Sequence, residues 1–126
     1  MDLVAAYVSQ LSLPENAARG LAGQFLGLIE DAVREKVSFG AAGRLRAAVP
    51  EMMQWQLSAP TLRPGTLSLH ELEGTPMLDP RAERDALLNR FHVPLSQAPL
   101  AQSLAVEFLA SRVAPSVMDA VHKSLP

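Results

Sequence analysis

The densest group of side chains that could carry chemistry is the run His70-Glu71-Leu72-Glu73, with Asp79 a few residues further on. Imidazole nitrogens and carboxylate oxygens can bind divalent metal ions. A structural zinc site, however, usually has four ligands and often includes thiolates, and this chain has no cysteine. Because the run holds a single histidine, we interpret it as solvated loop charges and predict no metal site.

Asp119 and His122 form a second pair, three residues apart in a predicted helix. A carboxylate beside an imidazole is the orienting half of a catalytic triad. The chain has no nucleophile elbow, phosphate-binding loop, dinucleotide fingerprint or His-Glu-x-x-His motif. We therefore predict no catalytic residue and no cofactor, and interpret the pair as part of a helix surface. His92 fits a helix end, where an imidazole is favourable to the helix dipole.

An apolar group that surrounds the only tryptophan is the candidate interaction surface, and it consists of Met52, Met53, Trp55 and Leu57. Methionine adapts its shape to a partner, and tryptophan contributes a large contact area, so both are enriched at recognition surfaces. The alternative is that these residues close one end of the core. The sequence leaves both interpretations open.

The composition is that of a folded domain: 126 residues, 48% hydrophobic and 19% charged, with a formal net charge of −2. Its nearest approach to a basic cluster is Arg34 and Lys36 with Arg44 and Arg46. Binding to a nucleic-acid duplex normally requires several clustered cations, so we interpret these residues as a solvated helix face and expect no nucleic-acid partner.

The absence of cysteine excludes a disulfide-linked scaffold. The start of the chain lacks the basic region of a signal peptide, and no apolar run approaches the roughly 18 residues that span a bilayer. We expect a soluble cytoplasmic protein without a transmembrane segment, unless a leader has been removed.

Apolar residues recur at three- and four-residue steps through most of the chain, which predicts amphipathic helices. Asp2 should cap the first helix, and Ser12-x-x-Glu15 has the form of a capping box for a second helix that runs to about Val37, with Glu30 and Arg34 toward solvent. Ser38 should cap the third helix. Further helical segments are expected at 51–57, from Pro80 to about 93, at 96–113 and from Pro115 onward.

The predicted fold is an all-α, compact bundle of about six to seven helices in a single domain. Its two helical subunits are expected at about 1–57 and 79–126, joined by a linker at 58–78 that is rich in proline and glycine. The second helix also contains Gly20, Gly23 and Gly27. Each glycine costs about 1 kcal/mol relative to alanine inside a helix, so we predict that another helix packs closely against these glycines.

The two subunits resemble each other when the sequence is shifted by 83 residues. The shift places Ala18, Leu21, Ala22, Phe25 and Leu26 on Ala101, Leu104, Ala105, Phe108 and Leu109. An internal duplication and two independent helix pairs of similar composition both explain this match.

Several short motifs carry a resemblance to a known family. They are the runs at 11–17 and 21–28, together with Ala48-Val49-Pro50 and Ser58-Ala59-Pro60. In these runs the chain resembles the VcgC/VcgE-like bacterial family of unknown function. Ser12 departs from the family pattern, which usually has glycine there, as does Glu51, where glycine would follow the proline. The resemblance implies an all-helical fold and assigns no activity.

Since no assembled reactive centre is predicted, we interpret the chain as a non-enzymatic interaction module that binds an unknown protein partner or self-associates. An alternative is a carrier of a small apolar ligand or lipid, held between the two halves. A third is an uncharacterised enzyme that uses His122 and Asp119.

Overall fold

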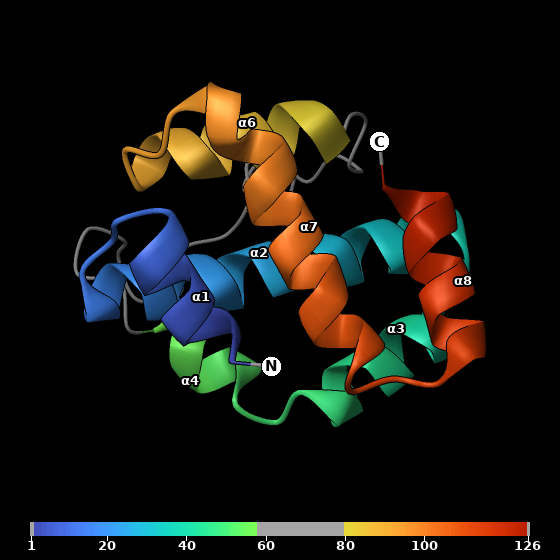
Figure 1. The fold of residues 1–126 in the computed structure, drawn as a ribbon. Coiled ribbons are helices and arrows are strands. Elements are labelled where there is room, and N and C mark those ends of the chain that lie inside the picture. Colours follow the sequence, from blue (N-terminus) through green and yellow to red (C-terminus); the bar gives the residue numbers. More distant parts are fainter. Residues whose placement is uncertain (1, 58–79, 126) are drawn as a thin grey trace.

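The computed structural model describes residues 2–57 and 80–125, which form seven α-helices and one short 3-10 helix, with no β-strand among them (Figure 1). The all-α prediction of six to seven helices is confirmed. The predicted linker at 58–78 lies outside the described residues. In chain order the elements are α1 (Leu3–Gln10), α2 (Glu15–Lys36), α3 (Phe39–Ala48), α4 (Met52–Gln56), α6 (Pro80–Arg90), η1 (Leu95–Gln97), α7 (Ala98–Ala110) and α8 (Pro115–Ser124).

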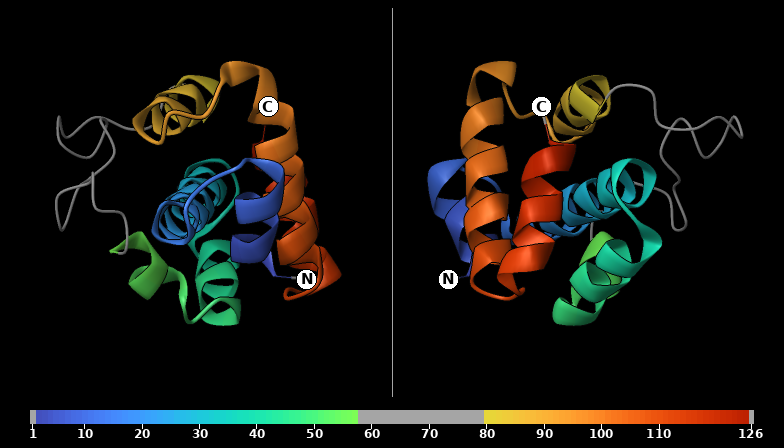
Figure 2. Two further views of the ribbon diagram at one scale, coloured as in Figure 1. Left: turned by 60° about the vertical axis from the view of Figure 1, so that its left-hand side comes forward. Right: turned by 90° about the vertical axis from the view of Figure 1, so that its right-hand side faces the viewer.

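α2 is the central helix, and each of the other six described α-helices contacts it. The left view of Figure 2 shows α2 nearly end-on, with α6 above it and α3 below. The consecutive residues 20–23 are all buried, as are 28–30. Since successive residues lie about 100° apart around a helix, these runs show that neighbours cover α2 on several sides rather than along one stripe.

The two halves of the chain interlock through their first helices. α1 packs against α7 as well as against α2, and α6 packs against α2 as well as against α7. The hydroxyl of Tyr7 in α1 donates a hydrogen bond of 2.8 Å to the carbonyl oxygen of Ala101 in α7. Tyr7 is fully buried, and this burial raises the pKa of its phenol well above the ordinary range. The first helix of each half therefore lies on the long helix of the other half.

A single apolar cluster joins the halves and contains buried residues from every one of the seven α-helices. The largest of its fully buried aromatic side chains are Tyr7, Phe25 and Phe108. A core shared in this way makes the packing of each half depend on the other.

The helix starts agree in part with the sequence signals. The side chains of Asp2 and Ser38 accept hydrogen bonds of 3.1 Å from the amides of Ala5 and Ala41, as expected of N-caps. The predicted capping box at Ser12 is wrong. α2 begins at Glu15, with Pro14 in the N-cap position, because Ser12 has a left-handed backbone (φ +56°) and forms the corner before the helix.

Ser12 and His92 are the two non-glycine residues with positive φ among the described residues. His92 (φ +59°) follows α6, where the amide of Val93 donates to the carbonyl of Leu88 (3.0 Å) and that of His92 to Asn89 (3.1 Å). This pair of bonds is a Schellman motif, whose left-handed position is usually glycine. Ser12 and His92 thus both adopt a left-handed backbone conformation that glycine would adopt without strain.

The interpretation of Glu30 as solvent-facing is also wrong, because its side chain is only 3% exposed. Amphipathic periodicity assigns one outer face to a helix, but α2 has neighbours on several sides, and α3 covers the side that carries Glu30. Among the described residues, no helix is long and apolar enough to cross a membrane.

Candidate interaction surface

The four apolar residues of the candidate interaction surface, in α4 and at its C-cap, divide into a buried pair and an exposed pair. Met52 is fully buried in the core, and Trp55 is partly buried against it. Met53 and Leu57 are 61% and 63% exposed. Met53 lies in the helix, and Leu57 is its C-cap residue. We call Met53 and Leu57 the α4 surface.

α4 lies on two of the predicted packing glycines of α2. A Cβ atom on Gly23 would clash with the backbone amide of Gln56 and would lie 2.7 Å from the carbonyl carbon of Trp55. A Cβ atom on Gly27 would lie 2.6 Å from the side-chain nitrogen of Gln56. At Gly23 the backbone of α4 therefore lies too close to α2 for a side chain, whereas at Gly27 the neighbouring atom is the end of the flexible Gln56 side chain. Gly20 is also buried in α2.

Two amide side chains hold the same junction together. Gln56 donates from Nε2 to the carbonyl oxygen of Gly23 (3.2 Å), and Gln24 donates from Nε2 to the carbonyl oxygen of Gln56 (3.3 Å). Both bonds are part-buried. The contact between α4 and α2 thus combines a close backbone approach with a reciprocal pair of amide hydrogen bonds.

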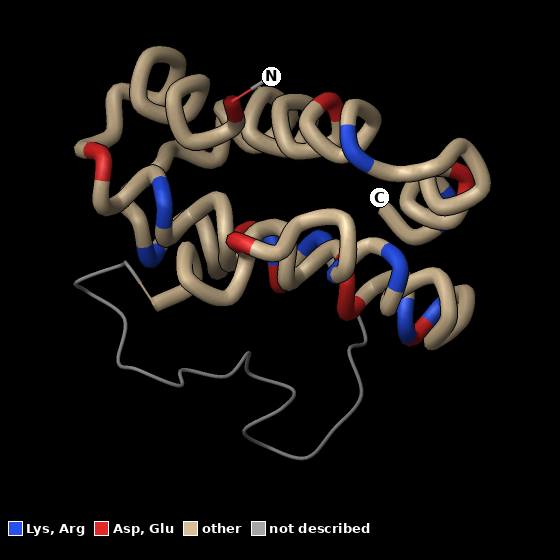
Figure 3. The backbone as a smooth tube through the Cα atoms, turned by 90° about the horizontal axis from the view of Figure 1, so that it is seen from below, with Lys and Arg blue, Asp and Glu red and all other residues tan. Residues whose placement is uncertain are grey.

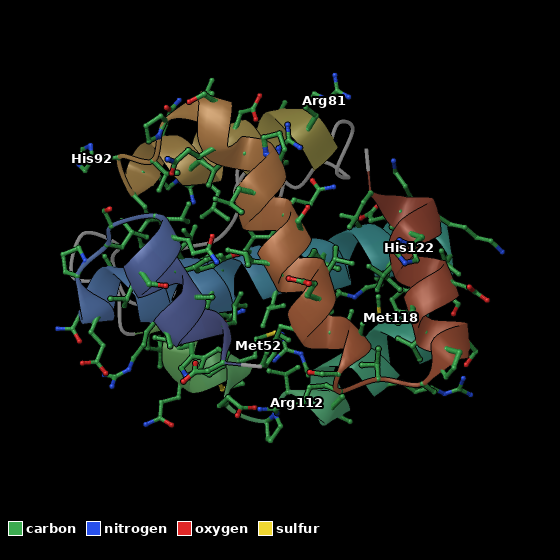
Figure 4. All side chains as sticks on the ribbon, viewed as in Figure 1. Met52, Arg81, His92, Arg112, Met118 and His122 are labelled. Atoms are coloured by element: carbon green, nitrogen blue, oxygen red, sulfur yellow. The ribbon has the colours of Figure 1, made fainter. Side chains whose placement is uncertain are left out.

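Arg112 links α4 to the second half of the chain. Its guanidinium donates to both carboxylate oxygens of Glu51, at 3.0 and 3.2 Å, and to the carbonyl oxygen of Ala48 at 3.3 Å. Figure 4 shows Arg112 below α7, beside α3 and α4. The hydrogen bonds from Arg112 are the main cause that lowers the pKa of the Glu51 carboxyl. One side chain therefore joins the end of α3, the start of α4 and the segment after α7.

Aromatic contacts continue this link. The guanidinium carbon of Arg112 lies 4.8 Å from the centroid of the Phe108 ring, within the range of a cation–π interaction. The rings of Phe108 and Trp55 lie 5.9 Å apart, tilted by 51°. Trp55 is thus held between α2 and α7 and does not project from α4 as a free side chain.

A second exposed apolar site lies at the corner between α2 and α3. Phe39 is 78% exposed and Val37 is 42% exposed. The α4 surface differs from this corner because its exposed residues alternate along the chain with Met52 and Trp55, which pack in the core. The remaining exposed large apolar residues, Val8 and Leu95, lie on α1 and η1.

The basic residues predicted to form a solvated face are partly neutralised by the buried carboxylate of Glu30. Arg34 lies 2.6 Å from Glu30 and 2.9 Å from Asp31. Nε of Arg46 lies 2.6 Å from Oε2 of Glu30, and Nη2 of Arg46 donates a hydrogen bond of 3.1 Å to Oε1 of Glu30. Figure 3 shows acidic and basic residues interspersed along the backbone. The arrangement gives no support to a nucleic-acid surface.

The histidines do not assemble a reactive centre in the described part of the chain. His122 and Asp119 are both exposed on α8, and His92 is exposed at the corner after α6. Figure 4 shows His92 and His122 at opposite ends of the molecule. His70, Glu71, Glu73 and Asp79 lie outside the described residues, so the interpretation of that run stays a prediction. Within residues 2–57 and 80–125, no group of three or more potential ligands is placed to hold a metal ion.

Sequence reasoning missed Glu30 and the link formed by Glu51, Arg112 and Phe108. Glu51 and Arg112 are 61 residues apart, and no local spacing relates them. The one available signal was the i, i+4 spacing of Phe108 and Arg112, which places both on one side of a helical turn.

Neither a protein-family model, nor a curated protein, nor a solved structure matches this chain. The resemblance to the VcgC/VcgE-like family and the internal duplication therefore stay predictions.

Proposed function

We propose that this chain is a non-enzymatic protein interaction module and that the α4 surface is its docking site. The observation that carries the proposal is the exposure of Met53 and Leu57, one turn apart, on a helix whose Met52 is fully buried. A buried anchor fixes the position of the exposed pair. An apolar pair that is held in place loses little conformational entropy when a partner covers it.

The chemistry of the surface indicates the kind of partner. Glu51, at the start of α4, is already paired with Arg112, and Gln54, the exposed residue that follows Met53, is neutral. A protein that presents an apolar face fits such a surface better than a strongly charged ligand does. A second copy of the chain satisfies the same requirement.

The two other hypotheses receive less support. A carrier needs an apolar cavity between the halves, whereas the large side chains of α1, α2 and α7 pack there into one buried cluster. An enzyme that uses Asp119 and His122 needs them in an enclosed site, whereas both are exposed on α8.

The test compares self-association and partner capture for three forms of the full chain. The first is the wild type, the second carries Met53→Ser and Leu57→Ser, and the third carries Leu95→Ser. Leu95 is a matched control because it is an exposed apolar residue on a different element. Light scattering over a wide range of concentration measures self-association, and affinity capture from native lysate measures binding to other proteins.

We expect an assembly or a captured protein that the α4 double variant loses and the Leu95→Ser variant retains. Circular dichroism should show the same helix content in all three forms, because the changed side chains are exposed. A wild type that stays monomeric and captures nothing rejects the proposal. Binding that survives the double variant, or that Leu95→Ser removes equally, rejects the α4 surface as its site.

A further inference from the structure

α4 is attached to the bundle by fewer buried side chains than the longer helices are. It has only five residues, and Met52 is the one that is fully buried. A helix this short is not stable by itself in water, so its formation depends on tertiary contacts. Regions with few buried apolar contacts are the ones that open locally at a free energy below that of global unfolding.

The contacts that hold α4 come from two directions. Gly23, Gly27 and Gln24 of α2 hold its C-terminal end through the close backbone approach and the amide bonds. Arg112 holds its N-terminal end through Glu51 and the carbonyl of Ala48. The same guanidinium packs on Phe108, the ring that contacts Trp55. α4 is therefore held at its two ends by contacts from different parts of the chain.

We propose that Arg112 is a clasp that keeps α4 on the bundle, and that α4 opens as a local unit when this clasp is released. The clasp can be released because it is open to solvent: the side chains of Arg112 and Glu51 are 35% and 31% exposed. Salt screens ion pairs that solvent reaches much more than it screens buried pairs. Ionic strength is therefore a handle on how firmly α4 is held.

If the α4 surface is the docking site, as proposed above, opening of α4 would regulate binding of the partner. Opening of α4 moves Met53 and Leu57 away from their position on the bundle. A partner that requires them in place would thus bind more weakly when the clasp is open. The opening itself is a property of the free protein and can be measured without any partner.

The experiment measures hydrogen exchange of the full chain for wild type, Arg112→Met and Arg19→Met. Arg112→Met keeps a long apolar stem over Phe108 but removes the bonds to Glu51 and Ala48. Arg19→Met is a matched control because it breaks another solvent-accessible pair, that of Arg19 with Glu15 on α2. Trp55 gives a second readout: it is the only tryptophan, so quenching of its fluorescence by acrylamide reports on α4.

We expect Arg112→Met to speed exchange of the amides at 52–57 by roughly fivefold, as loss of about 1 kcal/mol would, while the α2 amides change less. Trp55 should become easier to quench. High salt should move the wild type in the same direction, and Arg19→Met should change neither readout. Glu51→Gln, which keeps the shape of the side chain, should reproduce the effect in part.

Three results would overturn the clasp. In the first, the wild-type α4 amides exchange as slowly as those of Leu26 and Ile29, so that α4 opens only with the whole protein. In the second, Arg112→Met speeds α2 and α4 equally. In the third, Arg19→Met has the same effect. None of these results depends on a partner, so each leaves the docking proposal to its own test.

Discussion

α3 and α4 follow each other in the chain and both pack against α2, but their attachments use different chemistry. α3 contributes buried Ala42 and Leu45, and its Arg46 reaches the buried carboxylate of Glu30. The backbone of α4 lies directly on α2 at Gly23, where α2 has no side chain. The α3 interface is filled by side chains, whereas the closest approach of α4 requires that α2 has no side chain at Gly23.

The two interfaces are therefore sensitive to opposite kinds of substitution. The α3 interface contains a carboxylate whose burial is tolerated only while both guanidiniums remain beside it. The α4 interface cannot accept an added atom at Gly23, because the nearest opposing atoms there belong to the backbone of α4. Removal of a group should therefore damage the first, and addition of a group should damage the second.

The largest effect is expected for the double variant Arg34→Met and Arg46→Met, which leaves the buried carboxylate of Glu30 without either of its arginine partners. Because a buried charge without a partner is costly, the free energy of unfolding should fall by about 3 kcal/mol. Chemical denaturation monitored by circular dichroism measures this change. Glu15→Gln is the control, because Glu15 forms a solvent-exposed pair with Arg19 and its loss should cost less than about 0.5 kcal/mol. Equal losses in both variants would contradict a structural role for Glu30.

The next effect is expected for Gly23→Ala, which adds one methyl group at the α4 contact. α4 must shift away from α2, and stability should fall by about 2 kcal/mol despite the better helix propensity of alanine. Gly43→Ala in α3 is the matched control, since an added Cβ atom there meets nothing within 4 Å. That variant should gain about 0.5 to 1 kcal/mol. Thermal and chemical unfolding measure the stability of both variants. Loss of stability in both variants would show that any substituted glycine is harmful and would contradict a close contact specific to Gly23.

The smallest effect is expected for Glu51→Gln, which weakens the ion pair with Arg112. Glu51 is 31% exposed, whereas the carboxylate of Glu30 is 3% exposed. Stability at neutral pH should fall by about 0.5 kcal/mol. Because Arg112 lowers the pKa of Glu51 in the folded chain, the pair stabilises the fold above the unfolded carboxyl pKa. This contribution is lost as the pH falls through the lowered, folded pKa.

A denaturation series from neutral to acidic pH measures that loss. The difference between wild type and Glu51→Gln should shrink toward zero at the acidic end. A difference that stays constant over the series would show that the Glu51 carboxylate charge does not contribute.

Much of the fold follows from local sequence signals. Periodic apolar residues predicted the helices, the N-caps at Asp2 and Ser38 formed as expected, and prolines marked the ends of α3 and α6. The missing capping box at Ser12 shows the limit of these signals. A serine three residues before a glutamate can cap a helix only in an extended backbone, and here the corner between α1 and α2 imposes a left-handed one.

Residue types predict only half of the candidate surface. Of the four apolar residues at 52–57, the structure buries Met52, partly buries Trp55 and exposes Met53 and Leu57. Residue type does not separate these outcomes, because methionine occurs in both sets. The separation depends on which side of a short helix faces α2, and that orientation comes from contacts distant in sequence.

Local sequence signals predict most of the described helices, since helix periodicity, caps and prolines act over a few residues. It also showed where a close helix contact was needed, because glycines inside a helix are costly without one. Only the tertiary structure decided that α4 fills that contact, that Glu30 is buried between two arginines, and that Arg112 holds Glu51. These pairings join residues far apart in the chain, and their geometry is set by how the helices pack around α2, which no local spacing encodes.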